Sequence, residues 1–450
     1  MVSGIALLLI ILSAVIFIII AASVFKLHPF LALLLATLLT GLVVGVPLKQ
    51  ILEAVNQGFG NLLGSIGLVV VLGSMIGIVL EKSGAALQIA NVVIGLVGKS
   101  RPTLAMGVIG GVVGIPVFCD SGFIILSGLA KALARKTGKN FSALALSLAG
   151  GLYTTHVLVP PTPGPLACAG NLGLADHLGQ VILIGLLVSI PSTAVAIIFA
   201  NYIGKNIDET TLEKFENEKV STQENGNLPS TFLSLLPIIL PILLIAFASF
   251  VSFFSFSETL KTIIQFLGSP LIALLLGLVC SFFLIKKWDK SFLNDLMGDG
   301  ITQAGTILIL TGAGGAFGAL LKATPVAQMV NDWVANSQVS GVWVLVIGYL
   351  IAALLKTAQG SSTSALVITS SMLAPLLQTV GFETPTEVSL LVMAIGAGAM
   401  TASHANDSYF WVVSQFSHFQ LKDAYRGMTL MSLLQGITVL LTTILVFLFI

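Results

Sequence analysis

The sequence predicts an all-α polytopic membrane protein, and three observations support this class. Of the 450 residues, 56% are hydrophobic and only 9% are charged, whereas soluble domains carry about 25% charged residues. The mean hydropathy is +1.04. Long stretches are apolar on every side rather than along one stripe, and in water such surfaces would aggregate. The bilayer is therefore the expected solvent of the chain.

The membrane segments are predicted from the apolar runs, because a helix needs about 20 apolar residues to cross the hydrocarbon core. The clear single spans are residues 4–25, 29–46, 180–202, 232–254, 263–285, 341–355 and 428–450. Between them lie shorter or interrupted apolar segments, including residues 62–80 and 301–321. We expect roughly 10–14 membrane segments in all, some of them re-entrant hairpins.

One strongly polar stretch, residues 205–230, divides the chain into two parts of similar length. We interpret it as a solvated linker between a first membrane repeat, residues 1–204, and a second, residues 231–450. Weak matches recur in the same order in both parts. Gly73, Gly77, Leu80 and Ala86 have counterparts at Gly314, Gly318, Leu321 and Ala327, a constant separation of 241 residues (314 − 73). A duplication is predicted, and the sequence leaves its parallel or inverted sense open.

The first polar break is the stretch 114–122, where Asp120 and Ser121 stand between two apolar segments. A carboxylate at membrane depth is costly and usually faces a cavity or a partner. Asp120 is therefore a candidate for substrate binding or proton coupling. The alternative is a structural partner for a helix end or a lysine.

The second break is the stretch 153–165, which holds Thr154, Thr155 and His156 before a run of prolines and glycine at 160–165. Such a run cannot stay in a regular helix, and irregular backbone is not tolerated against lipid. The segment should therefore line a cavity enclosed by protein. His156 is either a titrating group or a structural hydrogen-bonding residue.

The third break, 356–364, places Lys356 before a glycine and a run of hydroxyl residues. These residues are Gly360, Ser361, Ser362 and Thr363. A helix that begins here would be capped by Ser or Thr and would present backbone amides to an anion such as a carboxylate. Lys356 is predicted to pair with that anion or with Asp120. The alternative role of the hydroxyls is helix packing.

The fourth break is the stretch 403–411, with a cluster of polar side chains between apolar segments. They are Ser403, His404, Asn406, Asp407 and Ser408. These groups suit the hydroxyls of a substrate, and the alternative is a solvent-exposed turn. The four breaks occur as matched pairs in the two parts, which is the expected pointer to the binding site of a transporter.

The motifs in these breaks resemble the gluconate permease family of gluconate:proton symporters, over nearly the whole chain. The resemblance rests on Thr155-His156 with the double-proline run, on 360–363 and on 403–411. It implies two inverted repeats, re-entrant hairpins with broken helices and an elevator-type motion, as in the wider ion-transporter superfamily. The chain departs from the family at Asp120, Thr162 and Lys356, where a glutamate, a histidine and an arginine are usual. A small carboxylate is therefore a firmer prediction than gluconate itself, and glycerate or D-serine are alternatives.

The leading hypothesis is a secondary transporter for proton-coupled uptake of gluconate or a related hydroxy-carboxylate, in the cytoplasmic (inner) membrane. The expected substrate contacts are Asp120, Ser121, Thr154, Thr155, His156, Gly360, Ser361, Ser362, Thr363, Ser403, His404, Asn406, Asp407 and Ser408. The proton-coupling candidates among them are Asp120, His156, His404 and Asp407.

Three rival functions remain open at this stage. One is a sodium-coupled carboxylate transporter, and another is a transporter of a D-amino acid such as D-serine. An intramembrane enzyme is a distant third, because the chain lacks a zinc-protease motif and a phosphate-binding loop. No cofactor or metal is expected. The expected partners are the substrate anion, a proton or sodium ion and the bilayer, without nucleic acid, and a homodimer is left open.

Overall fold

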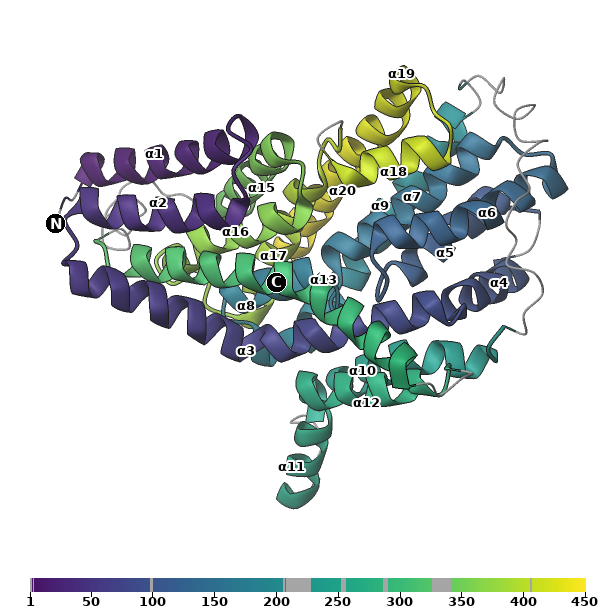
Figure 1. The fold of residues 1–450 in the computed structure, drawn as a ribbon, viewed down its shortest axis with the longest axis horizontal. Coiled ribbons are helices and arrows are strands. Elements are labelled where there is room, and N and C mark those ends of the chain that lie inside the picture. Colours follow the sequence, from purple (N-terminus) through teal and green to yellow (C-terminus); the bar gives the residue numbers. More distant parts are fainter. Residues whose placement is uncertain are drawn as a thin grey trace.

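A computed structural model describes residues 2, 4–97, 100–204, 207, 228–251, 256–285, 290–325, 341–404 and 407–450. Across these ranges the chain is helical and has no β-strand, which confirms the predicted all-α class (Figure 1). Most of the predicted linker 205–230 lies outside the described residues, so its role as a connector stays a prediction.

The first part of the chain forms nine α-helices and one 3-10 turn in the described ranges. They are α1 (Gly4–Ser23), α2 (Pro29–Val44), α3 (Leu48–Lys82), α4 (Ala85–Val97), α5 (Pro102–Val113), α6 (Cys119–Thr137), α7 (Phe141–Leu158), α8 (Pro163–Asn171), η1 (Ala175–His177) and α9 (Leu178–Ile203). Three of these helices begin with proline, whose fixed φ and missing N–H suit the first helical position.

The second part contains a matching series of helices. They are α10 (Thr231–Phe250), α11 (Glu258–Leu267), α12 (Pro270–Phe282), α13 (Lys290–Lys322), α15 (Gly341–Gln359), α16 (Ser362–Leu373), η5 (Ala374–Leu376), α17 (Pro385–Met400), α18 (Ser408–Phe416), α19 (Leu421–Ala424), a π-helical turn (Tyr425–Thr429) and α20 (Leu430–Phe447). In the first part, α5 is followed by a break and α6, and the buried α7 is followed by a break and the short α8. In the second part, α15, α16, α17 and α18 follow one another in the same order. This order agrees with a duplication, but the sense of the two repeats stays a prediction.

Several helices are suited to a membrane by length and composition. Among the described residues, four helices are long and apolar enough to span it, or six if each of two bent pairs counts as one span. Further apolar helices of 10–17 residues stand beside them. The predicted span at 263–285 is divided between two helices, since α11 and α12 meet at 58°. Their junction contains Gly268, and Pro270 starts the new helix.

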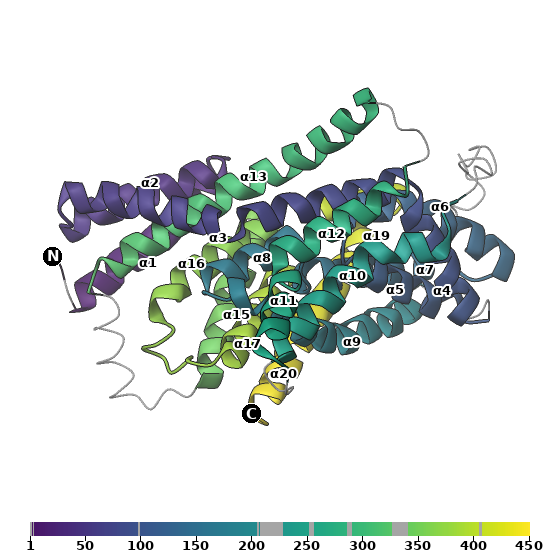
Figure 2. The same ribbon diagram turned by 90° about the horizontal axis from the view of Figure 1, so that it is seen from below.

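The two longest helices, α3 and α13, pack along each other across the molecule (Figures 1 and 2). Glycine permits this approach, since a Cβ placed on Gly58 would lie 2.4 Å from the carbonyl oxygen of Gly315. An ion pair between Lys82 and Asp299 joins the same two helices nearer one end. The apolar segments 62–80 and 301–321 are thus inner parts of longer helices rather than separate elements.

The buried centre of the molecule is built on α7 and α17. Nearly every side chain of both helices is buried, with α5 and α9 packed around α7, and α15 and α20 around α17. The short helices that follow them cross over: α8 packs on α16, and α18 packs on α6. This exchange brings the breaks of both parts of the chain into the middle of the fold.

Candidate functional site

Four helices begin at the predicted polar breaks, and their N-termini meet in two pairs. At one pair, a Cβ on Gly164 of α8 would lie 3.5 Å from the Oγ1 atom of Thr363 in α16. At the other pair, α18 packs on α6, with Ser408 at the first position of α18 and Asp120 in the first turn of α6. The first amides of a helix lack intrahelical partners and carry a partial positive charge. Paired N-termini in a protein interior therefore suit an anion.

The start of α16 confirms the helix cap predicted for the third break. The Ser361 side chain accepts a hydrogen bond from the backbone N–H of Ser364 at 3.2 Å. Gly360, directly before it, has φ of 76°, a left-handed conformation that glycine adopts without steric cost. The turn therefore reverses the chain sharply between α15 and α16.

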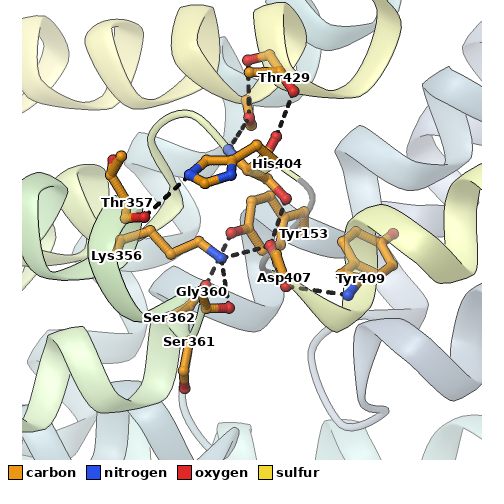
Figure 3. A network of polar contacts seen from close by, with 12 residues as sticks. Tyr153, Lys356, Thr357, Gly360, Ser361, Ser362, His404, Asp407, Tyr409 and Thr429 are labelled. Atoms are coloured by element: carbon orange, nitrogen blue, oxygen red, sulfur yellow. Dashed lines mark hydrogen bonds and ion pairs between the residues drawn. The ribbon is translucent and has the colours of Figure 1, made fainter. Parts of the chain in front are cut away.

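A buried ion pair lies at the centre of the site (Figure 3). The Nζ atom of Lys356, at the end of α15, is 2.5 Å from Oδ2 of Asp407, and their side chains are 1% and 6% exposed. Lys356 also donates to the carbonyl of Gly360 at 3.1 Å. The charge partner of Lys356 is thus Asp407 of the fourth break, rather than Asp120, which the sequence offered as a protein partner.

Asp407 is held by further contacts from its own segment. Its Oδ2 atom accepts the hydroxyl of Ser403, and its Oδ1 atom accepts the backbone N–H of Tyr409 at 3.1 Å, which caps α18. Both oxygens therefore have protein donors before any ligand binds. The contact with Lys356 joins the α15–α16 break directly to the α17–α18 break.

Two tyrosines form an aromatic wall beside this pair. The Tyr153 hydroxyl lies 2.9 Å from the Ser362 hydroxyl, and the Tyr153 ring centroid lies 5.9 Å from Nζ of Lys356. The Tyr409 ring is 5.3 Å from the Tyr153 ring, and its hydroxyl donates to the carbonyl of Ala149 at 2.9 Å. Neither tyrosine is among the site residues predicted from the sequence. The available signal was their position, because both lie inside polar breaks.

Two polar atoms near the site have no hydrogen-bond partner among the described residues: Oδ1 of Asp120 and Nδ1 of His156. Both atoms are buried. Phe118, the residue before α6, has its ring 5.7 Å from the His156 ring. A buried polar atom without a partner is costly, so both atoms are candidates for contact with a ligand.

The other predicted site residues lie at differing distances from this centre. The Thr154 hydroxyl contacts Gln435 at 2.6 Å and Ser192 at 3.1 Å, inside the packing of α7, α9 and α20. Thr155 faces the α5–α6 break, since a Cβ on Gly114 would lie 2.5 Å from its hydroxyl.

Two more of these residues lie in the first and fourth breaks. The Ser121 hydroxyl donates to the carbonyl of Phe118 at 3.2 Å. His404 has Nε2 3.0 Å from the carbonyl of Thr357, so it adds a second link between the third and fourth breaks. Asn406 lies outside the described residues.

A small cavity of about 20 Å³ lies beside the second break, and its lining is apolar. Pro116, Pro160 and Pro161 contribute to it, together with side chains of α3, α9, α10 and α12. It offers no charged or hydrogen-bonding side chain for an anion. The polar centre around Lys356, not this cavity, is therefore the candidate substrate site.

Apolar helices, polar breaks at their buried ends and an ion pair between the breaks define a multi-pass membrane transport protein. The chain matches the profile of the GntP family permease over residues 5–449, so it belongs to that family.

Relatives extend over most of the chain. An uncharacterised permease of Haemophilus influenzae is 36% identical, covering 87% of this chain and 81% of that protein. The gluconate permease of Zymomonas mobilis is 34% identical over 98% of both. In Escherichia coli, the Gnt-II system L-idonate transporter is 28% identical over 93% of both chains, and the D-serine transporter DsdX is 29% identical over 96% of both.

A solved structure supports the fold. The structure of MtrF from Neisseria gonorrhoeae aligns with a TM-score of 0.60, 16% identity and coverage of 88% of this chain and 83% of MtrF. Membership of the permease family makes the chain a transport protein rather than an enzyme.

Proposed function

We propose that this permease takes up a small hydroxy-carboxylate together with a proton, across the cytoplasmic membrane. The observation that carries the proposal is the convergence of two pairs of helix N-termini beside Lys356, whose side chain is buried in the fold. Broken helices whose N-termini point at an anionic substrate are a recurrent device of secondary transporters.

The relatives narrow the chemical class of the substrate. The names of these relatives mention gluconate, L-idonate and D-serine, and each of these molecules has a carboxylate and at least one hydroxyl group. In our proposal the carboxylate lies at the start of α16, near Ser361, Ser362 and Thr363. The substrate hydroxyls face Asp120 and Ser408, where an unpartnered carboxylate oxygen is available.

The remaining predicted residues complete the proposed site. Gly360 and Ser403 shape the two breaks, His404 links them, and Asn406 belongs to the same segment. Ser121, Thr155 and His156 line the first pair of breaks, and Thr154 supports them through Gln435. The proton carrier is one of Asp120, His156, His404 and Asp407.

The mechanism that we propose moves the broken helices as a unit. The repeated order of helices supports two repeats, residues 1–204 and 231–450, whose inverted sense is part of the proposal. The exchange of α8 and α18 between them ties the four breaks together. An elevator-type displacement of this buried centre against the α3–α13 pair is the motion that we expect.

Uptake by purified protein in proteoliposomes tests the proposal. Radiolabelled gluconate, L-idonate, glycerate and D-serine are offered under an imposed pH gradient, and separately under a sodium gradient at equal pH on both sides. We expect accumulation of at least one hydroxy-carboxylate with the pH gradient alone. Accumulation only with sodium would overturn the proton coupling, and failure of all four under both gradients would overturn the substrate class.

A further inference from the structure

We infer that Lys356 binds the substrate carboxylate and that the Asp407 carboxylate takes this place on Lys356 while no substrate is bound. When the substrate binds, Asp407 separates from Lys356 and accepts a proton. This inference rests on the proposed function, because it assigns the anion site and the coupling proton within the same centre. It selects one proton carrier from the four candidates and adds Lys356 to the substrate contacts.

Burial makes the Lys356–Asp407 ion pair costly in free energy. Among the described residues, the three other ion pairs have side chains 27–90% exposed, whereas this pair is 1% and 6% exposed. Burying two charges gives little net stability, since desolvation offsets most of their attraction. A packed apolar pair would hold the two breaks as well, so the charges themselves point to a function.

Lys356 lies where a bound carboxylate would also reach the α16 N-terminus. An ammonium group has three N–H donors, and the hydrogen bonds to Gly360 and Asp407 use two of them. Lys356 stands next to the α16 N-terminus, because its neighbour Tyr153 contacts Ser362. A carboxylate bound here would meet the ammonium group and the free amides of α16 together.

The charge balance of the site connects the entry of an anion with the entry of a proton. With Lys356 already neutralised by Asp407, an added substrate anion would bring an uncompensated negative charge into the interior, beside Asp120. If a proton from solution adds to Asp407 as the substrate anion takes its place on Lys356, the net charge is unchanged. One anion then enters with one proton.

Asp407 can accept the proton and still have hydrogen-bond partners for both of its oxygens. As an acid, it can still accept the backbone N–H of Tyr409 at Oδ1 and donate its new hydroxyl from Oδ2 to the Oγ atom of Ser403. The Ser403 hydroxyl hydrogen then rotates away. Asp407 therefore loses Lys356 without leaving either oxygen unpaired, and it remains the cap of α18.

Other titratable groups surround the carboxylate and are part of its environment. Cys119 and Asp120 approach from α6, Tyr153 and His156 from α7, Tyr409 from α18, and Lys356 from α15. His404 follows the same break and faces Thr357. Only Lys356 is in direct ionic contact with Asp407 in the described residues, so exchange of this contact is the simplest route to coupling.

The test measures binding of potassium gluconate to purified protein by calorimetry between pH 6 and pH 8. It is repeated in buffers of different ionisation enthalpy, so that proton uptake is counted. The wild type should take up one proton per gluconate, and its affinity for gluconate should fall about tenfold for each unit by which the pH rises. Asp407→Asn, which mimics the acid, should bind with the same affinity at every pH and take up no proton.

Matched variants separate this inference from loss of folding. Lys356→Met should abolish binding, and the uncharged double variant K356M/D407N should also fail to bind while it melts as a folded protein. If Asp407→Asn does not fold, the proton count of the wild type and the loss of binding in Lys356→Met still test the inference.

Three results would overturn the inference. They are wild-type pH dependence in Asp407→Asn, gluconate binding by Lys356→Met, and gluconate binding by the wild type without proton uptake. The proposed function fails separately, if the wild type accumulates no carboxylate in proteoliposomes.

Discussion

The crossing of α5 and α7 gives a sharp test of the packing that supports the site. A Cβ on Gly151 of α7 would lie 2.2 Å from the carbonyl oxygen of Gly107 and 2.8 Å from the backbone nitrogen of Gly111. Ordinary contact begins at 3.4 Å, so Gly151→Ala must open the crossing by about 1.2 Å (3.4 − 2.2). The opposing atoms are backbone, so they cannot rotate away. Overpacking of this kind costs about 1–3 kcal/mol or more.

The assay is thermal unfolding in detergent, with Gly128→Ala as the matched control. Gly128 lies inside α6, and a Cβ there would meet nothing within 4 Å. Since alanine favours a helix over glycine by about 1 kcal/mol, the control should melt at or above the wild-type temperature. Gly151→Ala should melt below it and lose uptake, because α7 leads into the second break. Equal melting temperatures for the two variants would refute this account of the crossing.

Three further substitutions test separate contacts. Asn171→Ala removes the hydrogen bonds from α8 to α16, and we expect a loss of about 1–3 kcal/mol, measured as a lower melting temperature together with reduced uptake. Thr384→Ala breaks the capping box with Glu387 and should cost about 0.5–2 kcal/mol while uptake by the surviving protein stays normal. Tyr153→Phe removes the 2.9 Å contact with Ser362 and should weaken substrate affinity about threefold to tenfold, read from KM at unchanged melting temperature.

The sequence predicted where the helices break, because prolines, glycines and polar residues interrupt apolar runs. The second break illustrates both the success and its limit. α7 ends at Leu158 and α8 begins at Pro163, so the helix does break in the predicted run. Pro163 and Pro165 nevertheless belong to the first turn of the next helix, where proline is tolerated.

The contacts between breaks could not be predicted from the sequence. Lys356 and Asp407 are 51 residues apart, and no local pattern distinguishes Asp407 from Asp120 as the partner. Thr154 and Thr155 are neighbours on one helix, so their side chains point about 100° apart, and only the packing of α9 and α20 shows that Thr154 faces Gln435. Composition and local motifs specify segments, whereas the pairing of segments depends on the tertiary fold.

The crossover of α8 onto α16 has a consequence for biosynthesis. Pro163 leaves the ribosome 199 residues before Ser362 (362 − 163). At about 5–20 residues per second, this corresponds to about 10–40 s. During that interval the Asn171 side chain has none of its α16 partners, because they have not yet been synthesised. α18 is different, since α6 is already in place when α18 emerges. We therefore expect α8 to need other hydrogen-bond partners during insertion, from the translocation machinery or from water. We do not expect this of α18.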